Sequence, residues 1–185
     1  MFPTPWYEHA GPQGPFSEVY EPAEDTFLLL DALDQDAGKL RSANIEICLE
    51  VGSGSGVIST FVASLIESKA FYICTDINPA AGLCTVETAI RNKVDIQPII
   101  TDLVESHGIE AAWAGGKNGR EVMDRLFPVV SDLLSTRGLF YLVTVKENNP
   151  DEIIEILQKY GLKGTKAICR RAGSENLAVL RFCKS

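Results

Sequence analysis

The sequence predicts an α/β protein built on a mostly parallel sheet that is doubly wound with helices. Three observations lead to this fold class. Short apolar runs alternate with helical patterns along the first half of the chain. A glycine-rich turn at residues 52–56 follows the first run and opens a helix. The first three runs end at or beside the acids Glu50, Asp76 and Asp102. Such alternation predicts parallel strands joined by helical crossovers.

The composition is that of a globular domain. The chain has 185 residues, of which 45% are hydrophobic and 23% are charged, so it is long enough to bury a core and too apolar for a disordered chain. Its net charge of −8 repels phosphate backbones, which disfavours nucleic acid as a partner. We expect a flexible N-terminal arm over residues 1–15, which holds four prolines and no apolar period, and a single domain over residues 16–185.

Neither a membrane span nor a disulfide framework is expected. No apolar stretch is long enough to cross a bilayer, and the N-terminus lacks a basic start followed by an apolar run. The five cysteines are an odd number with no CxxC pair. This pattern favours reduced thiols in a cytoplasmic or nuclear protein and predicts no metal site.

The elements of the first half can be placed from their boundary residues. Pro22 opens the first helix, and two acids follow in its first turn. Asn78 and Pro79 are typical of the N-cap and first position of a helix. The other expected elements are strands over residues 45–51, 71–77 and 96–101 and helices over residues 57–67 and 78–92.

The second half predicts two helices and three strands. The helical pattern over residues 118–134 contains Pro128, which is expected to kink or split it. Asn149 and Pro150 are expected to cap the next helix. The remaining elements are a helix over residues 153–160, strands over residues 138–145, 166–170 and 177–182, and a hairpin turn over residues 172–176.

The glycine turn favours a nucleoside ligand without a pyrophosphate. In the dinucleotide fingerprint G-x-G-x-x-G, the third small residue would fall where this chain has Val57. The spacing here is G-x-G-x-G, with Glu50 two residues upstream. This difference argues against an NAD-dependent oxidoreductase. Adenosine joined to a sulfonium amino acid is the ligand that the spacing suggests.

The acids at the strand ends support the same ligand. A carboxylate at Asp76 can accept both ribose hydroxyls, and Asp102 is placed to accept from an adenine amino group. Ligands of open α/β sheets bind beyond the carboxyl ends of the strands, so Glu50, Asp76 and Asp102 should share one rim. Any one of these acids could be a turn or cap residue, but three of them beside a glycine loop predict a nucleoside site.

These motifs resemble those of class I S-adenosylmethionine-dependent methyltransferases of the HemK-like group. The resemblance is strongest to the eukaryotic members that methylate a glutamine of the translation termination factor, and it extends from about residue 16 to the C-terminus. It lies in the blocks YEPAEDT at residues 20–26, LEVGSGSG at 49–56, CTDINP at 74–79, TDL at 101–103 and AAWAGGKNG at 111–119.

The resemblance implies the fold, the cofactor and the partners. It implies a Rossmann-like class I methyltransferase domain that uses S-adenosylmethionine. It also implies a heterodimer with a small zinc-binding activator subunit and the termination factor as the protein substrate. The cofactor contacts that it implies are Thr26, Glu50, Gly52, Gly54, Asp76, Asp102 and Leu103.

The catalytic motif of that group, Asn-Pro-Pro-Tyr, is absent from this sequence. In the family its asparagine and proline oxygens accept hydrogen bonds from the substrate NH₂, and its ring stacks on the amide, which positions the nitrogen for methyl transfer. The two Asn-Pro pairs here, at Asn78 and Asn149, stand at expected helix starts and lack a following aromatic residue. We assign no catalytic residue, and we interpret His107 as a solvated or packed side chain and Trp113 as a packing residue.

The absent motif belongs to a longer missing segment. Only residues 103–107 separate Asp102 from the next matching region, and five residues reach at most about 18 Å. The family places its fourth strand there, and in the usual order 3-2-1-4-5-7-6 that strand is central. The sequence therefore predicts a shortened form that lacks the fourth strand. Backbone groups left without partners would make its folding marginal.

Two functions remain open from the sequence. The first is an S-adenosylmethionine-dependent N-methyltransferase that acts on a protein glutamine, with other protein or adenine amino groups as further substrates and with this shortened chain inactive. The second is a non-catalytic form that binds the activator subunit or the cofactor as a decoy.

Overall fold

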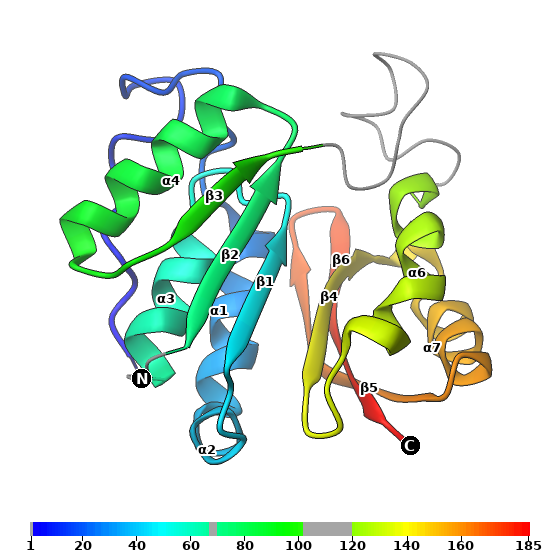
Figure 1. The fold of residues 1–185 in the computed structure, drawn as a ribbon. Helices are drawn as coiled ribbons and strands as arrows, with labels where there is room; N and C mark the ends of the chain where they lie inside the picture. Colours follow the sequence, from blue (N-terminus) through cyan, green and yellow to red (C-terminus); the bar gives the residue numbers. More distant parts are fainter. Residues whose placement is uncertain (1, 67–69, 102–119) are drawn as a thin grey trace. The chain divides into compact units, whose positions relative to one another are not determined.

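The computed structural model describes residues 2–66, 70–101 and 120–185, and it divides into two compact units at residues 103 and 104. Each unit contains one three-stranded sheet (Figure 1). The first sheet pairs in parallel in the order β1-β2-β3, and the second pairs antiparallel in the order β4-β6-β5. The strands are β1 (Ile47–Val51), β2 (Phe71–Asp76), β3 (Gln97–Ile100), β4 (Leu139–Val145), β5 (Leu162–Ala172) and β6 (Glu175–Lys184).

The two strand orders match the two halves of the expected sheet. The first unit corresponds to positions 3-2-1 and the second to positions 5-7-6, so the α/β class is confirmed. Among the described residues, no strand occupies the fourth position. Within the same residues β1 pairs only with β2, and β4 pairs only with β6. Both strands that would flank a fourth strand are therefore edge strands in their own sheets.

The helices of the first unit begin and end at residues with clear local causes. They are α1 (Glu24–Gln35), α2 (Ala37–Ser42), α3 (Val57–Ile66) and α4 (Pro79–Asn92). The Asn78 side chain accepts a hydrogen bond of 2.9 Å from the backbone N–H of Ala80, as its N-cap position predicts. Lys93 ends α4 in the left-handed conformation, with φ of 59°. The six-residue helix α2 was not predicted.

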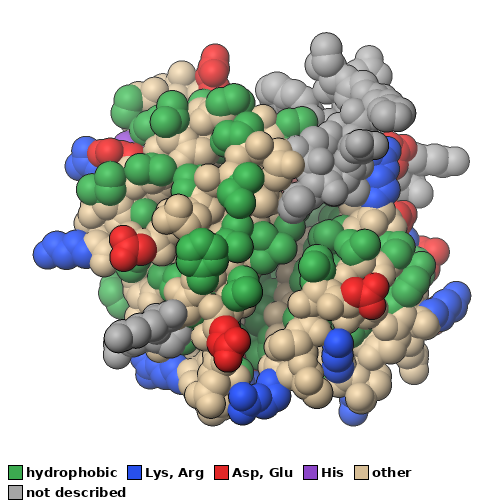
Figure 2. All heavy atoms as spheres, in the orientation of Figure 1, with side chains coloured by type: hydrophobic (Ala, Val, Ile, Leu, Met, Phe, Trp, Pro, Cys, Tyr) green, Lys and Arg blue, Asp and Glu red, His purple; other side chains and the backbone are tan. Residues whose placement is uncertain are grey.

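One face of the first sheet is packed and the other exposes apolar side chains. Helices α3 and α4 contact the strands, and α1 packs beside α3 (Figure 1). On the exposed side, Ile47, Leu49 and Phe71 are 65%, 44% and 53% exposed. Figure 2 shows apolar side chains gathered over these strands. The edge strand β1 thus presents alternate apolar residues, where a strand buried on both faces was expected.

The sequence predicts a flexible N-terminal arm over residues 1–15. In the structure, residues 2–15 contain no helix or long strand, and they lie against α4. The side-chain oxygen of Asn92 accepts a hydrogen bond of 2.9 Å from the backbone N–H of Trp6. His9 is buried, with 4% of its surface exposed. Ala10 and Val19 form a small buried cluster with residues of α4. The partners lie about 80 positions away along the chain, so local composition could not reveal them.

The second unit contains α6 (Glu121–Leu133), the short 3-10 helix η2 (Lys146–Asn148) and α7 (Pro150–Lys159). The helix is not split at Pro128, one of the two expected outcomes, because α6 continues through this residue. Proline removes one backbone donor from the helix. Phe127 and Val130, on either side of it, are buried in the core of the unit and hold the helix there. Asn149 precedes α7 with φ of 55°, and its side chain makes no backbone cap.

The closing hairpin is longer than expected. Strands β5 and β6 pair from Leu162 with Lys184 to Ala172 with Glu175, with a bulge between Lys166 and Ile168. Only residues 173 and 174 remain in the turn. No helix within the described ranges is both long enough and apolar enough to cross a bilayer.

Candidate functional site

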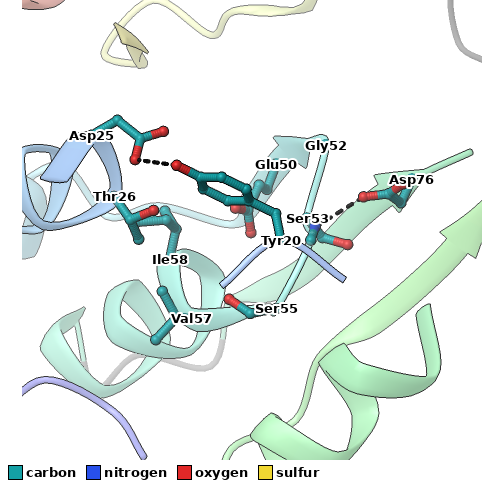
Figure 3. Close-up of a pocket in the computed structure, with 11 residues that line it drawn as sticks. Tyr20, Asp25, Thr26, Glu50, Gly52, Ser53, Ser55, Val57, Ile58 and Asp76 are labelled. Carbon is teal, nitrogen blue, oxygen red and sulfur yellow. Dashed lines mark hydrogen bonds between the residues drawn. The ribbon is translucent and has the colours of Figure 1, made fainter. Parts of the chain in front are cut away.

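A cavity of about 280 Å³ lies in the first unit where β1 and β2 end (Figure 3). This volume is near the lower end for ligand sites, so the described walls suit part of a nucleoside-sized ligand. Its lining comes from the segment before α1, the first turn of α1, the end of β1, the glycine loop, the start of α3 and the end of β2. The lining residues are Tyr20, Asp25, Thr26, Glu50, Gly52, Ser53, Gly54, Ser55, Val57, Ile58 and Asp76.

The glycine loop is fixed to the neighbouring strand and helix by its backbone. The N–H groups of Gly52 and Ser53 donate to the carbonyl oxygen of Thr75, at 2.8 and 3.0 Å. Gly56 has φ of 76°, and a Cβ atom there would lie 2.8 Å from Thr85 in α4. Glycine is therefore required at this position for close packing as well as for conformation.

The first two glycines of the loop serve a different purpose. Gly52 and Gly54 have φ of 80° and 49°, and no atom lies within 4 Å of where their Cβ atoms would stand. Both residues line the cavity. The absence of side chains here leaves the backbone open to close approach by a ligand.

Asp76 stands at the end of β2 with both carboxylate oxygens engaged by backbone donors. Its Oδ2 accepts from the N–H of Gly54 and its Oδ1 from the N–H of Asn78, each at 2.9 Å. The first of these bonds is drawn in Figure 3. A carboxylate oxygen has two lone pairs, so each oxygen can still accept one hydroxyl. The two backbone bonds fix the orientation of the carboxylate and leave a lone pair on each of its oxygens.

Glu50 links the end of β1 to the start of α3. Its Oε2 accepts from the backbone N–H of Ser59 at 3.1 Å and also from the Ser59 hydroxyl. Burial raises the pKa of the Glu50 carboxyl to about 7, and the charge of Asp76 adds to this effect, whereas the bonds from Ser59 oppose it. A cationic ligand group nearby would favour the ionised carboxylate.

The segment just before α1 contributes a tyrosine to the wall that was not predicted as a site residue. Tyr20 donates its hydroxyl to Asp25 Oδ1 at 3.1 Å, and it is 63% exposed. Thr26 lines the cavity, and its hydroxyl also accepts from the N–H of Ala23 at 3.4 Å. Tyr20 and Asp25 belong to the sequence block at residues 20–26, and this was the signal that could have predicted them as site residues. The other lining residues that the sequence did not predict as ligand contacts are Ser53, Ser55, Val57 and Ile58.

The structure brings five of the seven sequence-predicted site residues to one cavity, namely Thr26, Glu50, Gly52, Gly54 and Asp76. Asp102 and Leu103 lie outside the described residues, as do His107, Trp113 and the block at residues 111–119. The preceding residue, Thr101, donates its N–H to the carbonyl oxygen of Asp76 at 3.0 Å. The chain thus leaves β3 beside Asp76.

The charge of the lining favours one class of ligand. It contains Asp25, Glu50 and Asp76 and no lysine or arginine among the described residues. Three carboxyl groups without a cation disfavour phosphates and suit a nucleoside that carries positive charge. No group of three metal-binding side chains occurs within the described ranges.

Comparison with known proteins identifies relatives over the full chain. No protein-family model matches it. Human methyltransferase HEMK2 is 59% identical over 212 residues, covering 100% of this chain and 98% of the human protein. The eRF1 methyltransferase catalytic subunit mtq2 of Schizosaccharomyces pombe is 35% identical over 207 residues, covering 90% of each chain.

Solved structures show the same fold. The Mtq2 structure from the E. cuniculi Mtq2-Trm112 complex, described as responsible for methylation of the eRF1 translation termination factor, has a TM-score of 0.66 at 24% identity. The match covers 91% of this chain and 99% of that one. Magnesium protoporphyrin IX methyltransferase from Synechocystis, solved with bound SAM, has a TM-score of 0.64 at 12% identity, covering 92% and 88%.

The alignment with the human protein is longer than this chain. It runs over 212 positions, whereas this chain has 185 residues, so about 27 positions have no counterpart here. A strand, a turn and a substrate loop need about that length. Full-length identity of 59% nonetheless shows that the chain belongs to the HEMK2 and Mtq2 family of methyltransferases.

Proposed function

We propose that this chain binds S-adenosylmethionine in the described cavity and belongs to the machinery that methylates a glutamine of the termination factor eRF1. The observation behind this proposal is the acidic lining around an open glycine loop, with Asp76 held ready to accept a diol. Two named relatives support the substrate. The S. pombe protein is an eRF1 methyltransferase, and a 30% identical Methanocaldococcus jannaschii protein is a putative protein N5-glutamine methyltransferase.

The residues of the cavity have separate roles toward the cofactor. Bound S-adenosylmethionine supplies an electrophilic methyl group on a sulfonium centre. Asp76 would accept the ribose hydroxyls, while Gly52 and Gly54 would let the backbone approach the ligand closely. Glu50 would supply negative charge toward the cationic end of the ligand. Asp102 remains a predicted acceptor for the adenine amino group, and Leu103 remains a predicted contact to the cofactor.

The substrate side of the reaction is where this chain departs from its family. An amide nitrogen is a weak nucleophile, and its activation requires fixed acceptors for the NH₂ group. The sequence holds no Asn-Pro-Pro-Tyr, and its two Asn-Pro pairs serve other structures. Asn78 caps α4, and the Asn149 amide donates to Glu152 at 3.1 Å.

This observation favours a second candidate function beside the first. We propose that the shortened chain transfers methyl groups only at background rate and acts as a non-catalytic form that binds the cofactor or the activator subunit. The subunit would be a small zinc-binding protein of the Trm112 kind, because the E. cuniculi relative was solved as an Mtq2-Trm112 complex. A cytoplasmic or nuclear location fits the five free cysteines.

A calorimetric titration of the purified chain with S-adenosylmethionine tests the cofactor. Saturable binding of S-adenosylmethionine, with none of NAD, is the expected result. Binding of NAD alone, or of neither compound, would overturn the proposed site. A matched titration with a Trm112-type subunit tests the partner.

Incubation with labelled S-adenosylmethionine tests the reaction. The chain, its partner and eRF1 are compared with a version in which a strand and Asn-Pro-Pro-Tyr are restored between Leu103 and Ser106. We expect label on eRF1 glutamine only with the restored version. Equal labelling by both proteins would show that the missing segment is dispensable, and no labelling by the restored version would contradict the proposed substrate.

A further inference from the structure

The N-terminal segment reaches the glycine loop through a buried chain of hydrogen bonds. His9 is 4% exposed, and its Nε2 lies 2.8 Å from the hydroxyl oxygen of Thr88 in α4. The same hydroxyl lies 2.6 Å from the carbonyl oxygen of Ser55, which belongs to the glycine loop and lines the cavity. Three segments that are far apart in the sequence thus meet at a single hydroxyl group.

The geometry determines which atoms donate. Thr88 has one hydroxyl hydrogen, and its oxygen lies 2.6 Å from the carbonyl oxygen of Ser55 and 3.0 Å from that of Cys84, which can only accept. The hydrogen therefore points to a carbonyl, with Ser55 the nearer, and the contact with His9 is completed by a hydrogen on Nε2. The Nε2 atom also lies 3.2 Å from the carbonyl oxygen of Cys84, another pure acceptor, which agrees with this tautomer.

The other ring nitrogen of His9 makes no competing hydrogen bond among the described residues. Nδ1 is buried and has no hydrogen-bond partner among the described residues. The imidazole stacks on Trp6 with ring centres 4.8 Å apart and meets the edge of Phe16 at 5.7 Å. Aromatic neighbours hold the ring in place, so Nε2 remains directed at Thr88.

The loop carbonyls are held toward α4 at two successive residues. Thr85, one turn before Thr88, places its hydroxyl 3.5 Å from the carbonyl oxygen of Gly54 and 3.2 Å from the Ser53 hydroxyl. In a trans peptide the C=O and the following N–H point in opposite directions. The bond from Thr88 that holds the Ser55 carbonyl against α4 therefore turns the N–H of Gly56 away from α4, where it donates to the carbonyl oxygen of Ser53 at 2.7 Å.

We propose that His9 is a positioning residue for the cofactor cavity, acting through Thr88 on the Ser55 carbonyl of the glycine loop. His9 is not among the residues that line the cavity, so its effect is indirect. A hydrogen bond received by the Thr88 oxygen strengthens the bond that its hydrogen makes to Ser55. This inference rests on the proposed binding of S-adenosylmethionine.

Variants that keep the ring or keep the donor test this role. His9→Phe retains an aromatic ring but has no N–H, whereas His9→Gln retains a donor. Thr88→Val removes the hydroxyl at constant shape. We expect His9→Phe and Thr88→Val each to weaken S-adenosylmethionine binding about three- to tenfold, the effect of one lost hydrogen bond. His9→Gln should bind with much of the wild-type affinity. The double variant that combines His9→Phe with Thr88→Val should lose no more affinity than Thr88→Val alone.

A control separates positioning from general destabilisation. Ile66→Val removes one buried methyl group at the far end of α3 and should lower the unfolding temperature without changing affinity. Equal affinity of His9→Phe and wild type, or equal weakening by Ile66→Val, would overturn the proposal. So would additive losses in the double variant.

Hydrogen exchange gives a readout that does not need the cofactor. The backbone amides of residues 53–56 should exchange faster in His9→Phe than in wild type or Ile66→Val. Unchanged exchange would overturn the positioning role. If the loop loosens but the wild-type chain binds no S-adenosylmethionine, the proposed function fails while the control of the loop by His9 stands.

Discussion

The backbone N–H of Gly54 donates to Asp76 Oδ2 at 2.9 Å, and this bond joins the turn of the glycine loop to the end of β2. The two residues are 22 positions apart. The loop thereby holds in place the same carboxylate that is expected to receive the ligand. Loop conformation and ligand recognition are consequently coupled at this contact.

Removal of the Asp76 carboxylate should weaken cofactor binding. In Asp76→Ala both oxygens that are available to ribose hydroxyls disappear, and the N–H of Gly54 loses its acceptor. We expect a loss of about 2–4 kcal/mol of binding free energy, measured by calorimetry. Asp95→Ala, an exposed acid before β3, is the charge-matched control and should bind as wild type does. Equal affinity of the Asp76 variant and wild type would contradict the assigned role.

The Glu50 carboxyl should make stability fall as pH rises. Its pKa is raised by burial from 4.5 to about 7. A raised pKa means that the folded chain holds the proton more tightly than the unfolded chain does. The stabilising contribution is therefore complete below pH 4.5 and is lost as the pH rises through about 7.

Glu50→Gln cannot titrate and should not show this slope. Relative to the variant, wild type should lose about 3 kcal/mol of unfolding free energy between pH 4 and pH 8. Denaturant titrations of both proteins across that range measure the difference. Parallel pH profiles of the two proteins would show that Glu50 ionises at its ordinary pKa.

Two glycine-to-alanine substitutions should change the stability of the chain in opposite directions. In Gly56→Ala the new Cβ would lie 2.8 Å from Thr85 at a φ of 76°, so we expect a loss of about 1–3 kcal/mol of stability. Gly38→Ala places its Cβ in open space inside α2 and should stabilise by about 0.5–1 kcal/mol. Thermal unfolding of both variants is the measurement. A neutral Gly56→Ala would mean that the loop can move away from α4.

The isolated chain should unfold at low denaturant concentration. Strands β1 and β4 each have only one partner among the described residues, and β1 exposes Ile47 and Leu49. We expect a broad or early transition, shifted upward by a Trm112-type subunit or by the restored strand. Guanidinium titration measures it. A cooperative transition of the isolated chain with a midpoint above about 5 M would contradict this expectation.

Local signals were sufficient to predict the strands and the longer helices of the first half of the chain, but not the short helix α2. Asn78 and Pro79 determine the start of α4 through one side-chain bond and one fixed backbone angle. The glycine loop and the acids at Glu50 and Asp76 follow from spacing alone, since parallel strands bring their carboxyl ends to one edge. The absence of the central segment is likewise a property of the sequence.

Other features were decided by contacts between residues that are distant along the chain. His9 lies in a segment without periodicity, and its buried position depends on Thr88, 79 residues later. Phe127 and Val130 keep α6 helical through Pro128 because burial in the second unit outweighs one missing backbone bond.

Contacts between residues that are distant along the chain also determine the pKa of Glu50 in the site. The acidic side chain of Glu50 is evident in the sequence, but its pKa of about 7 depends on how completely the fold removes it from water. Residue types and spacings specify turns, caps and strand ends because these involve neighbours along the chain. Burial, strand length and proton affinity depend on the atoms that surround a residue, and only the tertiary structure assembles those atoms.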